Sequence, residues 1–434
     1  MRFFICFLFL ALGFAPPTLA SSQGGFPNSP AFEGGSWWSE FTGAIDLTGF
    51  WEMRLAVRLQ DDQFQKPLTL AETRFQIDAE RDFDVVTLNL TADVFFDVVS
   101  DQYEFGLNGD EDIIDLRQAT AEFSPFDFMD VKLGRQVLTW GTGDLLFIND
   151  LFPKDWRSFL LGRDDEYLKA PTDAVKVSFY FSRLNLDAVY MPEFVPDRYI
   201  NGSRVSYFDP AVGALVGRPD VLKAVTPGGW FEKDELSLRL YQTFGPTEVA
   251  AYYYDGFWKS PAGTDTVLGQ AVFPELKVYG GSMRSALFGG IVNAEFGYYN
   301  SQDGAGETPF IRNDEIRLLA GYERDLGNEL TLGLQYSLEH KLHMKESLPA
   351  REARHVVTQR VTKQFWQQTL SFSLFNFYSP SEHDGHLRLK VAYKITDAVK
   401  LEGGFNVFYG RTSKTFFGQF QKTSNVSAAV RVSF

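Results

Sequence analysis

The amino-acid sequence predicts an all-β fold, an antiparallel transmembrane β-barrel of about 18 strands (roughly 16–18) with long extracellular loops. Three observations support this prediction. Apolar and polar residues alternate in many segments, tight turns alternate with longer connections, and beyond residue 20 no stretch of about 18 residues is continuously apolar, as a membrane-spanning helix requires. The composition agrees, because 42 Phe, 37 Gly and 16% aromatic residues are typical of a barrel with a lipid-facing outside and a wet inside.

The N-terminal residues have the pattern of a secretory signal peptide. Arg2 is followed by an apolar run from Phe3 to Phe14, and the segment ends at Ala20. We expect cleavage near Ala20, so that residues 1–20 are absent from the mature protein. The chain would then reach the cell outer membrane from the periplasm.

The mature chain is expected to carry no cysteine, cofactor or metal. Cys6, the only cysteine, lies within the signal, which excludes a disulfide and a catalytic thiol from the mature protein. The sequence has no phosphate-binding glycine motif, zinc signature or EF-hand loop. The net charge of −15 at pH 7 argues against nucleic acid as a partner.

The rest of the chain is expected to form one domain. Residues 21–40 are small and polar, which suggests a periplasmic lead-in, and residues 41–434 form the barrel, because no Pro/Ser-rich linker divides them. A secreted β-sandwich or β-helix is the soluble alternative. Long apolar faces and short turns disfavour it.

Alternation is clearest in residues 45–60 and recurs in residues 86–98 and 330–338. Residues 112–123 and 355–364 alternate poorly, which leaves the strand count open by two. In the first segment one face suits lipid and the other suits water. The apolar face carries Ile45, Leu47, Trp51, Met53, Leu55, Val57 and Leu59, and the polar face carries Asp46, Thr48, Glu52, Arg54, Arg58 and Gln60.

The closing segment also alternates and ends on an aromatic residue. Val430, Val432 and Phe434 share a face, whereas Arg431 and Ser433 lie on the other. A terminal strand with a C-terminal Phe resembles the assembly signal of bacterial outer-membrane barrels, which their insertion machinery reads. We therefore expect Phe434 to serve as a membrane assembly signal at the periplasmic interface.

Nine long connections separate the predicted strand pairs, and the tight turns between them are expected to be periplasmic. Nine extracellular loops close eighteen antiparallel strands with both ends periplasmic, as a single-chain barrel requires. The connection at residues 195–233 is either a lid or an ordinary surface loop. The nine connections are residues 61–67, 100–112, 142–172, 195–233, 260–273, 301–313, 341–354, 379–385 and 412–424.

The most unusual connection is the segment at residues 142–171, which is long, apolar and densely charged with both signs. A loop folded into the lumen, with apolar residues on the wall and charges across the passage, fits this mixture. The alternative is an outer loop packed on the rim or on a neighbouring loop. Under the first interpretation, the constriction residues are Asp144, Asp150, Asp155, Trp156, Arg157, Arg163 and Asp165.

Short motifs precede this segment and recur near the end of the chain. The stretch from Lys132 to Gln136, KLGRQ, is followed by Trp140-Gly141, and residues 375–385 and 415–420 lie in the last hairpins. These motifs resemble porin-like barrels of the alginate-export type and their uncharacterised relatives. The resemblance implies an 18-stranded barrel, a long loop that reaches toward the lumen, and a channel or exporter role.

One feature departs from the alginate exporters, which line their channel with many arginines and lysines. The inward candidates here are of mixed charge, and closure of the barrel would gather several cations on one wall. Such a wall suits a polar or amphipathic solute better than a pure polyanion. Alternatively, the lumen charges simply pair with each other. The expected pore-lining residues are Glu52, Arg54, Arg58, Arg74, Asp93, Arg388, Lys390 and Arg431.

These features favour an outer-membrane channel or export conduit for a polar or amphipathic solute. Its expected partners are outer-membrane lipid, the barrel insertion machinery and, for an exporter, periplasmic or inner-membrane proteins. An enzyme is not expected. One alternative is a rim-located hydrolase built on His383-Asp384 with Ser379 or Ser381, although adjacent residues in a tight turn rarely aim at one another. The other is a structural barrel without an open pore.

Overall fold

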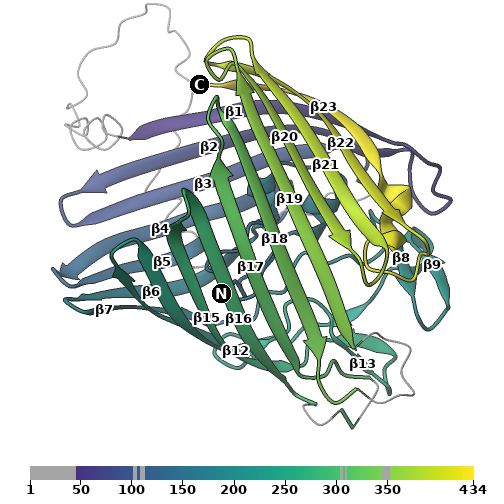
Figure 1. Ribbon diagram of the computed structural model, residues 1–434, viewed down its shortest axis with the longest axis horizontal. Helices are drawn as coiled ribbons and strands as arrows, with labels where there is room; N and C mark the ends of the chain where they lie inside the picture. Colours follow the sequence, from purple (N-terminus) through teal and green to yellow (C-terminus); the bar gives the residue numbers. More distant parts are fainter. Residues whose placement is uncertain (1–44, 101–104, 108–112, 304–305, 308–309, 345–351) are drawn as a thin grey trace, which may run out of the picture.

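The computed structural model describes residues 45–434, except residues 101–104, 108–112, 304–305, 308–309 and 345–351. The predicted signal peptide and periplasmic lead-in therefore lie outside the described residues. Most of the described chain belongs to one large sheet (Figure 1).

This sheet has 18 antiparallel strands and closes on itself, which confirms the predicted fold class and strand number. Chain neighbours pair around the sheet, and β1 pairs with β23 to close it, with Glu52 opposite Arg431. The strands are β1 (Asp46–Arg58), β2 (Leu68–Phe83), β3 (Val86–Asp97), β4 (Ile114–Phe126), β5 (Met129–Val137), β6 (Pro171–Phe181), β7 (Leu184–Met191), β11 (Glu235–Phe244), β12 (Thr247–Phe257), β15 (Glu275–Leu287), β16 (Gly290–Ser301), β17 (Glu315–Asp325), β18 (Leu330–Lys341), β19 (Ala353–Phe365), β20 (Leu370–Ser379), β21 (Asp384–Lys394), β22 (Val399–Gly410) and β23 (Asn425–Ser433).

The two poorly alternating stretches are both strands, and local packing explains their pattern. The register of β4 shifts against β3 between Thr91 and Ala92, and against β5 between Phe123 and Phe126, so the alternation is interrupted. In β19, the inward Val356 is buried in an apolar cluster, so apolar residues occupy both faces.

The described parts of the nine predicted loops lie at one end of the barrel, as predicted. The connection predicted at residues 379–385 is shorter than expected, because β20 extends to Ser379 and β21 begins at Asp384, which leaves a turn of residues 380–383.

The outer face of the barrel is apolar and the inner face is polar. On β1, the side chains of Leu47, Met53 and Leu55 are exposed by 60%, 49% and 48%, whereas Glu52 and Arg54 point inward and are buried. A soluble protein would bury the first set and expose the second. The exposed band is therefore the surface that faces lipid.

The last residue, Phe434, packs at the junction of the first and last strands. Phe434 and Gly49 exchange backbone hydrogen bonds of 3.0 and 3.1 Å, and the Phe434 ring stacks on Phe75 with centroids 5.5 Å apart. A Cβ on Gly49 would lie 2.8 Å from the Phe434 ring and 2.3 Å from the Gln76 carbonyl oxygen. Only glycine fits there without a shift.

Residues 138–170, here called the inward segment, fold into the lumen as predicted. The segment includes α3 (Trp156–Leu161) and η1 (Asp165–Leu168). Phe159, Leu160 and Leu161 are buried in a cluster with inward-facing aromatic residues of β20 and β22, such as Phe377 and Phe408. The extracellular half of the barrel therefore contains a packed apolar core.

The remaining elements belong to the extracellular loops. They are β8 (Tyr207–Asp209), β9 (Ala214–Val216), η2 (Arg218–Asp220), β10 (Ala224–Val225), β13 (Gly263–Asp265), β14 (Gln270–Val272) and η3 (Gly418–Thr423). Over the described residues, no helix combines the length and the apolar character needed to cross a membrane.

Candidate functional site in the barrel interior

Glu295 of β16 anchors the beginning of the inward segment. Its carboxylate accepts hydrogen bonds from the backbone N–H of Thr142 and of Gly143 (2.7 Å), and from the N–H (3.2 Å) and side-chain amide (2.8 Å) of Asn149. Gly141 has a φ of 82°, and a Cβ there would lie 3.0 Å from the Glu295 carboxylate. The Trp140-Gly141 motif thus lets the chain turn closely over this glutamate.

We expect Glu295→Gln to release this part of the segment. The amide replaces one acceptor oxygen with a donor that faces backbone N–H groups, which costs about 3 kcal/mol of local stability. Limited proteolysis of the detergent-purified barrel should then cut within residues 142–149. Glu323→Gln, on the inward face of β17, is the control and should leave the wild-type cleavage pattern. If residues 142–149 are equally protected from the protease in the wild type and in both variants, Glu295 is not the anchor of the segment.

Asp144 ties the segment to strands β18 and β19, which follow β16 and β17 in the sheet. Its backbone N–H donates to Gln335 of β18 (3.1 Å), and its carboxylate pairs with Arg360 of β19 at 2.9 Å. Burial raises the pKa of the Asp144 carboxyl, and Arg360 offsets part of this effect. This pair holds the segment to the barrel wall three strands away from Glu295.

The helix α3 and its exit are fixed by buried charges. Asp155 caps the helix by accepting from the Ser158 N–H at 2.7 Å. After the helix, Arg163 donates to Glu72 of β2 at 2.5 Å, and both side chains are more than nine-tenths buried. Because a buried ion pair is costly to break, Arg163 and Glu72 hold the end of α3 against the wall.

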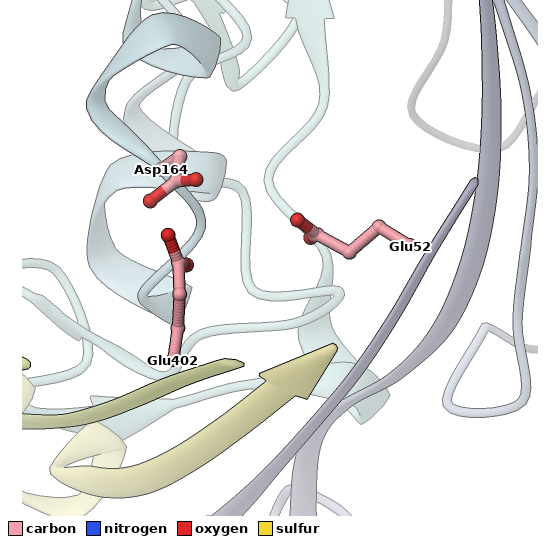
Figure 2. Close-up of side chains that lie close together, drawn as sticks. All are labelled: Glu52, Asp164 and Glu402. Atoms are coloured by element: carbon pink, nitrogen blue, oxygen red, sulfur yellow. The ribbon is translucent and has the colours of Figure 1, made fainter. Parts of the chain in front are cut away.

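Three carboxylates converge where the segment meets the junction of β1, β22 and β23. Glu52 extends from β1, Glu402 from β22, and Asp164 from the segment (Figure 2), and their oxygens lie within 4.8 Å of one another. Such a group resembles a set of metal ligands. However, Arg54 lies among the three carboxylates, at 2.9 Å from Glu52, 3.4 Å from Asp164 and 2.9 Å from Glu402.

Further cations complete this cluster. Arg431 lies 2.8 Å from Glu52 and 3.2 Å from Asp164, and Lys390 lies 2.8 Å from Asp164. Burial alone would raise the pKa of Asp164, but Lys390 and Arg54 outweigh it and hold the pKa of this carboxyl below its usual value. Protein cations thus supply the counter-charge that a metal ion would supply.

The structure places the predicted constriction residues in two groups. Asp144 and Asp165 pair with wall arginines, and Asp165 is exposed, so this group borders the remaining lumen. The other group supports the segment itself: Asp150 pairs with Lys154, and Asp155 caps α3. Trp156 donates to Asp197 of the next loop and so joins the segment to it. Arg157 is half-buried at the start of α3, and Arg163 is buried against Glu72.

The predicted pore-lining residues all point into the barrel, but the inward segment covers several of them. Glu52, Arg54, Arg74 and Asp93 are buried, and Arg74 pairs with both Glu72 and Asp93. These four are therefore not in contact with open water. The half-buried members are Arg58, Arg388, Lys390 and Arg431.

Residues 192–234 form a second layer over the inward segment, which the sequence left undecided between a lid and a surface loop. Arg198 bridges Asp115 of β4 (2.7 Å) and Asp155 of the segment (3.2 Å). Arg204 reaches Asp97 of β3 at 2.5 Å. This loop is thus tied to the wall and to the inward segment by buried carboxylates.

Two of the cavities inside the barrel are lined by charged residues. One of about 780 Å³ opens beside the β2–β3 turn and is lined by four carboxylates, including Glu122 and Asp130, and by Lys132 and Lys176. The other, of about 60 Å³, lies between the inward segment and β20–β23. The larger of these cavities thus lies at the turn end of the barrel, and the smaller one lies beside Asp164.

Asp384, Ser379 and Ser381, on which the hydrolase alternative depends, make structural contacts at the barrel rim. The Asp384 carboxylate accepts from the backbone N–H of Phe417 (2.6 Å) and of Gly418 (3.3 Å). Ser379 Oγ lies 3.1 Å from Ser381 Oγ. These contacts stabilise the turn between β20 and β21 and join it to the last loop.

No protein-family model matches the chain, and no curated protein matches it. Among solved structures, the chain is similar to Acinetobacter baumannii OccAB3, with a TM-score of 0.54 and 11% identity over 90% of this chain and 99% of that one. It is also similar to Pseudomonas aeruginosa OccK2 (OpdF), solved in complex with glucuronate, with a TM-score of 0.54 and 11% identity over 90% and 97% of the two chains.

At 11% identity this likeness concerns the fold alone. The chain has the fold of the porin-like outer-membrane β-barrels, which confirms that part of the resemblance found in the sequence. The alginate-export type stays a prediction.

Proposed function

We propose that this protein is an outer-membrane channel that passes a polar or amphipathic solute through a lumen narrowed by the inward segment. One observation carries the proposal: a charged segment of the chain crosses the interior of a closed 18-stranded barrel and is ion-paired to its walls. A barrel of this size encloses more space than its own side chains fill. A segment inside it therefore determines what passes.

The distribution of charge supports a polar solute. The 780 Å³ cavity is lined by carboxylates and lysines, and the cavity of about 60 Å³ beside Asp164 is lined by arginines, Lys390 and carboxylates. OccK2, which shares the fold, was solved with glucuronate, a polar sugar acid. An alginate-export-type conduit is the finer version of this proposal, and it would require periplasmic or inner-membrane partners.

A structural barrel without a passage is the second candidate, because the extracellular half contains a packed apolar core. Single-channel recording separates the two. We expect the mature protein, refolded and inserted in a planar bilayer, to conduct ions in steady steps. If heat-modifiable migration shows a folded barrel that never conducts, the channel proposal fails and the structural candidate replaces it.

A further inference from the structure

Two side-chain amides face outward from the barrel wall, on a surface whose exposed residues are mainly apolar. Gln359 of β19 and Asn376 of β20 lie opposite each other in the register of these strands. Gln359 also lies opposite Leu334 of β18, which is 55% exposed on the lipid-facing surface. All three side chains therefore point outward. Strands β18, β19 and β20 lie side by side in the near wall of the barrel in Figure 1.

Gln359 lies halfway along its strand. Since β19 extends from Ala353 to Phe365, Gln359 is six residues from either end. A tilted strand crosses the hydrocarbon layer in about 9–11 residues, so this amide lies at the depth of the lipid chains. Lipid chains offer no hydrogen-bond partner, and a polar group that faces them costs free energy. An outward amide at this depth is therefore favoured where a hydrogen-bonding partner covers it.

Contacts within the barrel satisfy these amides only in part. The Asn376 amide donates to the Gln359 side-chain oxygen at 3.1 Å, and the Tyr409 hydroxyl of β22 donates to the Asn376 side-chain oxygen at 3.2 Å. Tyr409 reaches Asn376 across β21 because Gly385 has no side chain, and a Cβ there would clash with the Tyr409 hydroxyl. Over the described residues, the two N–H groups of the Gln359 amide donate no hydrogen bond.

These amides are complementary to a second copy of the same surface. A carboxamide both donates and accepts hydrogen bonds, so two identical amides can form a reciprocal pair. Both copies of a barrel have the same orientation in the membrane, so a twofold axis between them runs along the membrane normal. A residue near this axis faces its own copy at the same depth. Apolar neighbours such as Leu334 do not favour a protein partner, because lipid chains solvate them equally well.

We propose that Gln359, Asn376 and Tyr409, here called the outward polar patch, form the interface of a homodimer in the membrane. The Gln359 amides of the two copies pair across the twofold axis. Asn376 and Tyr409 are positioning residues, because their hydrogen bonds orient the Gln359 carboxamide and leave its N–H groups to the partner. This interface goes beyond the proposed channel function, since it joins two complete barrels through their outer walls.

Disulfide crosslinking tests the interface in the membrane without removing an amide. Val361 lies two residues from Gln359 on the same outer face of β19, so the thiol of Val361→Cys should lie close to its own copy. The mature chain has no other cysteine, because Cys6 lies in the predicted signal. Mild oxidation of isolated outer membranes should link most of this variant into dimers. The matched control, Leu240→Cys, carries its thiol on β11 at a position that is 40% exposed, and should stay monomeric.

Sedimentation of the detergent-purified mature barrel provides the second measurement. We expect the wild type to form a dimer and Gln359→Leu/Asn376→Leu to dissociate about tenfold more readily, which is the effect of losing hydrogen bonds between chains in a membrane. Gln242→Leu removes an outward amide of β11, opposite Val249 of β12, and should dimerise as the wild type does. Heat-modifiable migration shows that each variant is folded.

Three results overturn the proposal. If Val361→Cys stays monomeric on oxidation, lipid or another protein covers the outward polar patch. If Val361→Cys and Leu240→Cys crosslink equally, the disulfides report random collision of barrels. If Gln359→Leu/Asn376→Leu dimerises as tightly as the wild type, the amides do not form the interface. Neither measurement involves conduction, so the dimer and the channel are tested separately.

Discussion

Replacing residues 145–163 with a short Gly/Ser linker is expected to raise the single-channel conductance about twofold or more, because the open cross-section of the lumen grows. The replacement removes α3 and the apolar side chains that pack on Phe377 and Phe408, together with the Arg163–Glu72 pair. The barrel wall itself keeps all its strand pairings, since none of them involves these residues.

The measurement is a planar-bilayer recording of wild type and variant, with the folded state checked by heat-modifiable migration. A matched control replaces residues 266–268 at an extracellular loop tip, where Val267 and Leu268 are 90% and 60% exposed. That control should conduct as the wild type does. Unchanged conductance in the segment variant would mean that the inward segment does not limit passage.

Phe434→Ala is expected to reduce the amount of assembled barrel in the outer membrane by about tenfold or more, because the terminal aromatic is both the predicted assembly signal and an anchor at the interface. The substitution removes the stacking on Phe75 but keeps the backbone bonds to Gly49. Assembly is measured as the heat-modifiable fraction in isolated outer membranes.

Phe416→Ala changes an exposed aromatic of the last extracellular loop and serves as the comparison. It should assemble normally. Refolding both variants in detergent distinguishes a loss of recognition by the insertion machinery from a loss of stability of the folded barrel. We expect Phe434→Ala to refold in detergent as the wild type does. Normal assembly in cells would refute the assembly role of Phe434.

Patterns formed by residues that lie close together in the sequence predicted the fold correctly. Alternation in residues 45–60 places Leu47 and Met53 on the outside and Glu52 and Arg54 on the inside, and the structure has this arrangement. Turn and loop lengths then determined the strand count. The interruptions in β4 arise from register shifts that no local pattern encodes, which is why that stretch remained uncertain.

The composition of the inward segment also predicted that it folds into the lumen, but not its partners. Arg163 and Glu72 are 91 residues apart, and the sequence offers many carboxylates of equal chemistry on the inner wall. Glu295 was missed for the same reason. Its signal is the donor-rich turn Gly141-Thr142-Gly143, which needs an acceptor, and the sequence does not indicate which strand supplies it.

The contacts of Asp164 also bear on how the barrel closes during folding. The first and last strands must meet across a separation of 379 residues between Glu52 and Arg431. Asp164 contacts Arg54 across 110 residues and Arg431 across 267. A single side chain in the middle of the chain thus binds both edges of the open sheet, and each contact closes a shorter loop than direct pairing of the edges. We therefore expect the inward segment to favour closure of the barrel, because it lowers the entropy cost of bringing the two edges together.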